Sequence, residues 1–348
     1  MMFSRPDILV TGAKGQLGSF FVNSFSLAAA AKSSSIGSVT GADIDDFDLT
    51  DYSSMKDFFE KNKLQDIDYV VHCAAATDTA AIEADPFKFY AANVLGTRNI
   101  ARWCAANKIK LIFISTDYVF SELSPMTADG DLQEFPVNQY GIQKRLAELE
   151  VMSAYTDKPD YFSIVRSSWM FGNSSRSFVE KILKMIASSC LKDYEVKVVD
   201  DAFGCPTHVS MMREMVLDII EHDKHGIFEC FSRKLQMNRY EWASIIWRDF
   251  KDEVMKLDCD MNRDIINDIA EKVSLKPVSS SSFPSSMKHP GKLKTFEMSL
   301  AEHNNWKDVC TRQYIASNIW RLIKLFVENA KLEDKVNVEK INAMMKKM

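Results

Sequence analysis

A glycine-rich turn near the N-terminus constrains the fold of this chain more than any other feature. A short apolar run, Asp7 to Thr11, leads directly into Gly12-Ala13-Lys14-Gly15-Gln16-Leu17-Gly18, and a helical stretch follows from Ser19 to about Ala31. The N–H groups and the dipole at the start of a helix attract anions, and glycines let the backbone approach a pyrophosphate closely. The G-x-x-G-x-x-G spacing therefore predicts a dinucleotide site. The residues expected to contact the dinucleotide there are Gly12, Gly15, Gln16 and Leu17.

An acidic residue follows the second expected strand. That strand covers residues 37–42 and ends at Asp43. A carboxylate at this point can accept hydrogen bonds from the adenine-side ribose hydroxyls and would repel a 2′-phosphate. Lys14 in the glycine turn has the opposite effect, because a cation can bind a 2′-phosphate. The sequence leaves NADH and NADPH both open, with Asp43 favouring NADH.

Strands and helices alternate through the first half of the chain. Apolar runs at residues 68–73, 110–116 and 161–167 continue the strand series, and helical patterns cover residues 86–107 and 138–154. Alternation with continuous apolar strands predicts a doubly wound parallel sheet. Ligands of such sheets bind outside the carboxyl ends of the strands. Because Gly12, Asp43, Ala74 and Thr116 all lie at such ends, we expect one crevice to hold them.

The pattern loosens after Trp169 and predicts a second, smaller α/β lobe. Short strands are expected at residues 196–200 and 226–230, and helices at residues 209–221 and 239–250. We therefore divide the chain into a nucleotide-binding domain (1–168), a substrate-binding lobe (169–329) and a charged tail (330–348). Elements of the first two parts could interleave.

Composition limits the class of protein. Of 348 residues, 46% are hydrophobic and 26% charged, typical of a globular protein with core for two moderate domains. The formal net charge of -5 argues against partners such as nucleic acids or membrane surfaces. No run of about 20 apolar residues suggests a membrane span. Seven cysteines without CxxC spacing predict reduced thiols in a cytoplasmic protein, with no metal site.

A tyrosine and a lysine in the 138–154 helix suggest catalysis. Tyr140 and Lys144 are four residues apart and share one face of the helix. A tyrosine with its ordinary pKa of about 10 is a poor acid–base group at neutral pH, and a neighbouring ammonium lowers that pKa. Thr116 ends a strand 24 residues earlier, and its hydroxyl could donate to a substrate carbonyl beside the tyrosine.

Together these features resemble the extended short-chain dehydrogenase/reductase superfamily and, within it, the dTDP-4-dehydrorhamnose reductases (NDP-4-keto-sugar reductases). The similarity runs in family order over residues 7–210 and continues more weakly to about Trp306. The motifs that carry it are the glycine turn, His72-Cys73-Ala74-Ala75-Ala76-Thr77, Ser115-Thr116-Asp117-Tyr118-Val119-Phe120, Tyr140-Gly141 with Lys144, Arg166-Ser167-Ser168-Trp169, and Asp201-Ala202-Phe203-Gly204-Cys205-Pro206-Thr207.

The resemblance implies a Rossmann fold and an activity. The activity would be NADH- or NADPH-dependent reduction of the C4 keto group of a nucleotide-linked 4-keto-6-deoxyhexose, as in dTDP-rhamnose biosynthesis. Thr116, Tyr140 and Lys144 would be the catalytic trio. The cofactor would be contacted by Ala74, Ala75, Thr77, Tyr140 and Lys144, in addition to the glycine turn and Asp43. The sugar-nucleotide substrate would be contacted by Thr116, Asp117, Tyr118 and Trp169.

The chain also departs from the family pattern, at Thr79-Ala80, Ser121-Glu122, Ser177 and Lys288-His289-Pro290. These departures bear on substrate identity and on subunit contacts, where a homodimer is one option, rather than on hydride chemistry. Two other functions stay open. A nucleotide-sugar 4,6-dehydratase or 4-epimerase uses the same scaffold, although dehydratases carry an Asp-Glu pair where this chain has Asp117-Tyr118. The regulatory β subunit of methionine adenosyltransferase also resembles this family, so the fold can serve as a non-catalytic binding module.

Overall fold

The structure is a computed structural model. It describes residues 5–31, 35–172, 177–192, 195–231, 236–257, 273–283, 288–293 and 306–331, with 342, 345 and 346. The chain forms two compact units, and each is built from separate segments. Unit 1 comprises residues 1–168, 209–232 and 285–294, and unit 2 the segments between and after them. Most of the expected charged tail lies outside the described residues.

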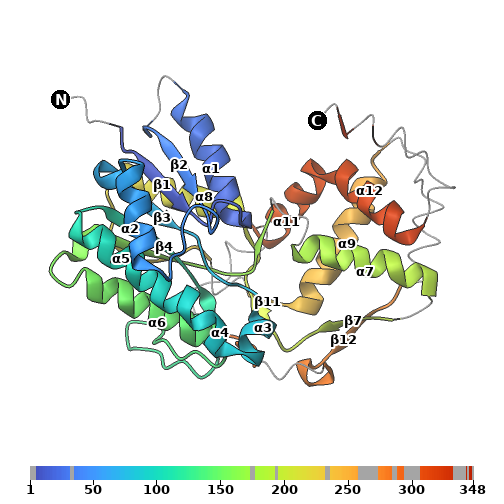
Figure 1. Cartoon of the computed structure of the whole chain (residues 1–348). Coiled ribbons are helices and arrows are strands. Elements are labelled where there is room, and N and C mark those ends of the chain that lie inside the picture. Colours follow the sequence, from blue (N-terminus) through green and yellow to red (C-terminus); the bar gives the residue numbers. More distant parts are fainter. Residues whose placement is uncertain are drawn as a thin grey trace. The chain divides into compact units, whose positions relative to one another are not determined.

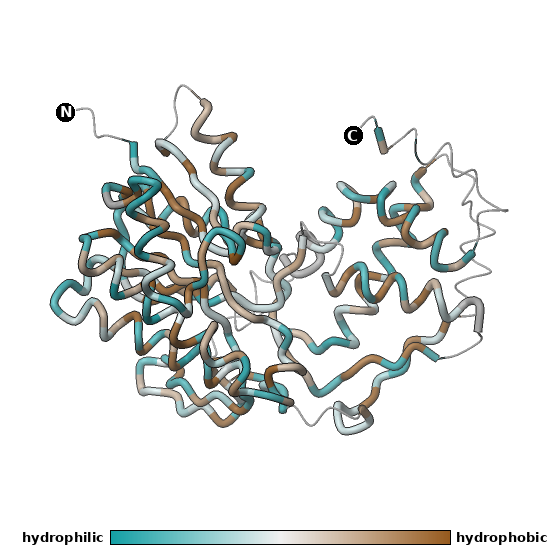
Figure 2. Tube along the Cα trace, in the orientation of Figure 1, coloured by the Kyte–Doolittle hydropathy of each residue, from teal (hydrophilic) through white to brown (hydrophobic). Residues whose placement is uncertain are grey.

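Unit 1 is built on a parallel sheet of six strands (Figure 1), which confirms the expected doubly wound fold. The strand order is β10-β5-β4-β3-β1-β2, and every neighbouring pair is parallel. The strands are β1 (Ile8–Thr11), β2 (Val39–Ala42), β3 (Tyr69–His72), β4 (Lys110–Thr116), β5 (Phe162–Ser167) and β10 (Gly226–Glu229). The central strands are buried on both faces, which is why their sequences are continuously apolar and appear brown in Figure 2.

Helices cover both faces of this sheet. In Figure 1, α2, α5 and α6 lie on one side, and α1 and α8 lie on the other. An aromatic core holds the first layer together: the Phe59 ring lies 5.2 Å from that of Trp103 and 6.0 Å from that of Phe47. The helical segments of unit 1 are α1 (Gln16–Ala29), α2 (Tyr52–Lys61), η1 (Leu64–Asp66), α3 (Thr79–Ala84), α4 (Pro86–Tyr90), η2 (Ala91–Gly96), α5 (Thr97–Ala106), η3 (Asp117–Val119), α6 (Gln139–Ala154), η4 (Pro159–Tyr161) and α8 (Val209–Glu221).

Two elements that the sequence analysis placed in the smaller lobe belong to unit 1. The segment 226–230 supplies β10, which pairs in parallel with β5, and the helix 209–221 is α8, which packs on α1 and β5. The sequence analysis allowed the two parts to interleave but did not identify these elements, because the chain returns to the first sheet only after it has begun unit 2.

Unit 2 combines helices with three short strand pairs. Its parallel pairs are β6 (Met170–Phe171) with β9 (Thr207–His208) and β7 (Val196–Val199) with β12 (Leu275–Val278), and its antiparallel pair is β8 (Phe203–Gly204) with β11 (Met237–Asn238). Its helical segments are α7 (Phe178–Lys192), α9 (Arg239–Val254), η6 (Ser280–Ser282), α11 (Trp306–Ser317) and α12 (Ile319–Ala330). A capping box formed by Asn238 and Glu241 begins α9. None of the described helices is both long and apolar enough to cross a bilayer.

Candidate active site

The glycine turn is packed too tightly to accept side chains. Gly12 has a φ of +70°, and a Cβ there would lie 2.7 Å from the backbone of Ala74. A Cβ on Gly18 would lie 2.1 Å from the Gly12 carbonyl oxygen. The first turn of α1 contains no acidic residue, so nothing in it offsets the positive end of the helix. The turn therefore fits the pyrophosphate role that the sequence predicts.

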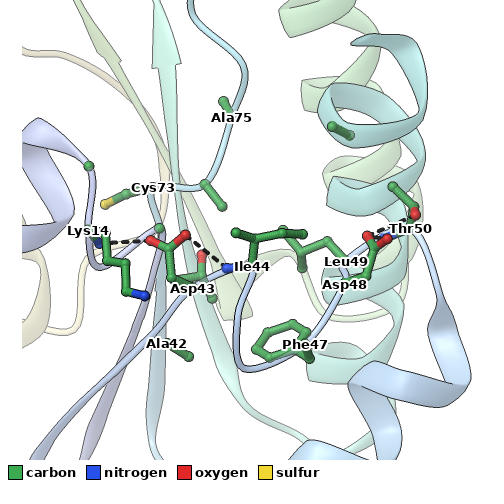
Figure 3. Close-up of a pocket in the computed structure, with 15 residues that line it drawn as sticks. Lys14, Ala42, Asp43, Ile44, Phe47, Asp48, Leu49, Thr50, Cys73 and Ala75 are labelled. Carbon is green, nitrogen blue, oxygen red and sulfur yellow. Dashed lines mark hydrogen bonds between the residues drawn. The ribbon is translucent and has the colours of Figure 1, made fainter. Parts of the chain in front are cut away.

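A cavity of about 280 Å³ opens beside this turn at the carboxyl ends of β1, β2 and β3 (Figure 3). The predicted residues Gly12, Gly15, Asp43, Ala74 and Ala75 all line it, so the structure brings these five together. Its remaining lining residues are Thr11, Lys14, Ala42, Ile44, Phe47, Asp48, Leu49, Thr50, Cys73 and Ala92.

Five residues predicted to bind the cofactor do not line this cavity: Tyr140 and Lys144, which are described below, and Gln16, Leu17 and Thr77. Gln16 and Leu17 form the first turn of α1, and Leu17 is buried in the core. Thr77 is exposed in the connection between β3 and α3. Their assignment as cofactor contacts stays a prediction.

The Asp43 carboxylate fixes one end of the cavity. One of its oxygens accepts the backbone N–H of Lys14 at 2.7 Å, and the other accepts the backbone N–H of Ile44 at 2.8 Å (Figure 3). The Lys14 ammonium pairs with Asp45. Asp43 thus joins the glycine turn to the loop after β2, and these hydrogen bonds hold its carboxylate at the cavity wall.

Thr116 and Tyr140 meet at the carboxyl end of β4. Thr116 is the last residue of β4, and Tyr140 lies in the first turn of α6, whose N-cap Asn138 accepts the Gly141 N–H at 2.8 Å. The Tyr140 hydroxyl lies near the Thr116 side chain, and this interaction lowers the pKa of Tyr140. The rings of Tyr118 and Tyr140 pack edge to face at 5.8 Å. The structure therefore brings these predicted residues together.

Lys144 lies one helical turn after Tyr140 on α6, and its side chain is buried. Its Nζ donates to the Ile114 carbonyl at 2.7 Å and lies 4.1 Å from the centroid of the Phe113 ring. Burial lowers the pKa of Lys144 to about 7, and the nearby Glu148 carboxylate opposes this decrease. Burial raises the pKa of the Cys73 thiol and the nearby Lys144 ammonium opposes this rise, so Lys144 lies close to a residue that lines the cavity.

The pKa of Tyr140 differs from the sequence-based expectation. Burial raises this pKa, the Asp117 carboxylate raises it further, and only the interaction with Thr116 lowers it. We expected the Lys144 ammonium to lower it, which is not observed. The physical reason is that Lys144 directs its amine to the Ile114 carbonyl and, through burial, holds its proton weakly. Tyr140 consequently keeps its proton at neutral pH.

The other predicted substrate residues fall in different surroundings. Asp117 is buried and accepts hydrogen bonds from Ser168 at 2.5 Å and from Thr116 at 3.2 Å. Trp169 belongs to unit 2, where its ring stacks on Trp242 at 5.7 Å and the Arg239 guanidinium lies 3.7 Å from its centroid. Asp117 therefore lies with Thr116 and Tyr140, whereas Trp169 packs against Trp242 and Arg239 within unit 2.

Sequence reasoning missed several residues of the site. Residues 44 and 47–50, which follow Asp43 in the sequence, also line the cavity. Their position directly after a predicted cofactor contact was the sequence signal that could have identified them. Asn93 is buried in the π-helix η2, accepts the Ala76 N–H at 2.8 Å and donates to Gln143 at 2.9 Å. It holds the β3 connection against α6 one residue before Lys144. A π-helix often marks a functional site, but its wider turn leaves no sequence pattern.

The chain is similar to several known proteins. The family model described as the RmlD substrate binding domain matches residues 6–317. The dTDP-4-dehydrorhamnose reductase of Mycolicibacterium smegmatis is 32% identical over 216 residues, which are 62% of this chain and only 60% of that protein. The dTDP-4-keto-6-deoxy-D-glucose reductase of Streptomyces niveus is 30% identical over 220 residues, 63% of this chain and 70% of that protein. The crystal structure of dTDP-4-dehydrorhamnose reductase from Bacillus anthracis in complex with NADP has the same fold, with a TM-score of 0.67 and 24% identity over 90% of this chain and 99% of that one.

Proposed function

Because the chain belongs to the RmlD substrate-binding domain family, we propose that it reduces the C4 keto group of a nucleotide-linked 4-keto-6-deoxyhexose to an alcohol. This membership confirms the family expected from the sequence. The names of two relatives describe dTDP-linked sugar reductases. We therefore propose a dTDP-linked 4-keto-6-deoxyhexose as the first substrate to test and NADH or NADPH as the reductant.

The observation that carries this proposal is the position of the Tyr140 hydroxyl. It lies near Thr116 at the carboxyl end of β4, and Lys144 lies one helical turn away near Cys73, a residue that lines the cavity. A phenol, a hydroxyl and an amine at one strand end, next to a dinucleotide cavity, suit the reduction of a carbonyl group. A structural role alone does not require Tyr140 and Thr116 to meet here.

The side chains have distinct parts in the proposed reaction. The cofactor, when bound, supplies a hydride to the carbonyl carbon. Tyr140 holds the proton that the new alkoxide needs, and its raised pKa keeps that proton on the phenol at neutral pH. Thr116 orients the carbonyl oxygen toward Tyr140. Lys144 supports the cofactor side of the site and is partly protonated near neutral pH.

Replacing Tyr140 by Phe tests the proposal. We expect Tyr140→Phe to lower turnover by about 10²- to 10⁴-fold, because the variant loses the proton donor. Oxidation of NADH or NADPH with a dTDP-4-keto-6-deoxyhexose is followed by absorbance, and cofactor binding by titration calorimetry. Tyr52→Phe, at an exposed tyrosine of α2, is the matched control.

The outcomes separate the proposal from its rivals. Near wild-type turnover of Tyr140→Phe would remove this residue from the chemistry. Cofactor binding without turnover of any nucleotide-linked 4-keto sugar, together with a stoichiometric protein partner, would favour the regulatory-subunit function. A nicotinamide that stays bound through purification would favour an epimerase.

A further inference from the structure

The loop after β2 places several carboxylates around one end of the cofactor cavity. Asp43 and Asp48 line the cavity, and Asp45 and Asp46 lie between them in the sequence. Asp46 is tied to this group because its carboxylate accepts the Asp43 N–H at 2.8 Å. Four acidic side chains therefore occur within six residues, beginning at the residue expected to face the adenine-side ribose.

Lys14 is the one cation among the described residues that line this cavity. Its ammonium forms an ion pair with Asp45, and the charges of Asp43 and Asp46 add to the attraction. Asp45 does not line the cavity. Its carboxylate is paired with the Lys14 ammonium, which is the group that could attract an anion into the cavity.

This ion pair contributes little to folding. The two side chains are 65% and 69% exposed, and ion pairs between exposed side chains are weak because water and salt screen them. The main consequence of the ion pair is that the Asp45 carboxylate neutralises the positive charge of Lys14 beside the cavity. Substitution of either residue should therefore leave the fold intact, so binding can be measured on folded variants.

NADPH differs from NADH by a 2′-phosphate on the adenine ribose, which carries between one and two negative charges. To meet that phosphate, Lys14 must share its ammonium with Asp45 or leave it, and in either case the Asp45 carboxylate stands close to a second anion. The Asp43 carboxylate adds repulsion, because two backbone N–H groups fix its position. Ribose hydroxyls meet no such opposition, since a hydroxyl donates to a carboxylate.

We infer that Asp45 is a specificity-determining residue: by pairing with Lys14 it makes this cavity select NADH over NADPH. The inference rests on the proposed function, because it assumes that the cavity binds a nicotinamide dinucleotide. It adds to that proposal a residue outside the cavity wall that controls the choice of reductant through Lys14.

Direct binding tests the inference without depending on turnover. Dissociation constants of NADH and NADPH are measured by titration calorimetry for the wild-type protein and for Asp45→Asn. We expect the wild-type protein to bind NADH more tightly than NADPH. The Asp45→Asn variant should bind NADPH about fivefold more tightly than the wild type and should leave NADH nearly unchanged. The control is Asp57→Asn, which removes an equal charge from an exposed position on α2.

Two further measurements exclude an indirect effect. In the double variant Lys14→Ala/Asp45→Asn the gain in NADPH affinity should disappear, because the freed ammonium is what binds the phosphate. The preference of the wild type for NADH should also weaken as salt is raised, which a change in packing would not produce.

The results that overturn the inference differ from those that overturn the function. Equal or tighter binding of NADPH by the wild type, or an Asp45→Asn variant with unchanged NADPH affinity, overturns the inference even if reductase activity is present. Failure of both dinucleotides to bind overturns the inference and the proposed function together. NADH-selective binding without sugar reduction overturns the function alone.

Discussion

At the scale of single residues, Lys144 should lose its proton near neutral pH. Burial lowers its pKa from 10.5 to about 7, and the carboxylate of Glu148 opposes this decrease. Titration of the Lys144 side chain by carbon-13 or nitrogen-15 NMR should therefore give a midpoint near 7. In Glu148→Gln the midpoint should be lower, because the opposing negative charge is lost. A wild-type midpoint near the ordinary lysine value would contradict the burial of the amine.

The same shift links the stability of the protein to pH. The folded-state pKa of Lys144 is below its unfolded value, so between about 7 and 10.5 the unfolded chain binds more protons at this site. The contribution of Lys144 to the free energy of unfolding should therefore rise with pH across that window. Urea denaturation of the wild type and of Lys144→Met at two pH values inside the window measures it. An equal pH dependence in both proteins would speak against the shift.

The proximity of the residues that we propose for catalysis was partly predictable at this scale. The four-residue spacing of Tyr140 and Lys144 and the strand-end position of Thr116 predicted their proximity, and the structure brings Thr116 to Tyr140. The electrostatics were not predictable. Whether a lysine lowers the pKa of a tyrosine depends on where its amine points and how deeply it is buried, and tertiary packing decides both.

At the scale of elements, α6 is fixed to the sheet by a buried acidic residue. Glu148 accepts hydrogen bonds from Ser115 on β4 at 2.6 Å and from Arg166 on β5 at 2.9 Å. Glu148→Ala would leave Arg166 buried without its main partner, so we expect a loss of about 3–5 kcal/mol in the free energy of unfolding, measured by urea denaturation. Glu150→Ala on the same helix is the control. A loss close to that of the control would show that the ion pair is not stabilising in this way.

The glycine turn permits a second test of an element. In Gly18→Ala the added Cβ would lie 2.1 Å from the Gly12 carbonyl oxygen, so the start of α1 must move away from the turn. We expect Gly18→Ala to lose most of its affinity for the dinucleotide, measured by fluorescence titration. Gly226→Ala is the control: its φ of +109° makes a side chain strained, but nothing lies within 4 Å of the new Cβ. That variant should lose stability and keep its affinity. Unchanged affinity in Gly18→Ala would contradict the role of the turn.

Long elements were predicted better than short ones. The strand 110–116 and the helix 209–221 have the expected bounds, because each is long enough for its apolar pattern to be seen. The two-residue strands of unit 2 were missed, since two residues cannot display a period of two. The helices α7, α11 and α12 were also not predicted.

At the scale of the whole molecule, the interleaved chain limits how the protein can be divided. A fragment of residues 1–168 lacks β10 and α8 and would expose the buried side chains of Ile164 and Val165 on β5. We expect this fragment to aggregate or to unfold without cooperativity, as measured by circular dichroism in urea. Adding a peptide of residues 209–232 should partly restore it. Cooperative unfolding of the fragment alone, at the midpoint of the full chain, would contradict this expectation.

The order of synthesis on the ribosome also delays completion of the sheet, because β10 is made long after β5. The nascent chain makes β5 early, but the strand that will cover its outer side emerges only after a large part of unit 2 has been translated. During that delay β5 is an open edge that could pair with another polypeptide. Slower translation between these two strands should therefore lower the yield of correctly folded protein, even though the finished molecule is unchanged.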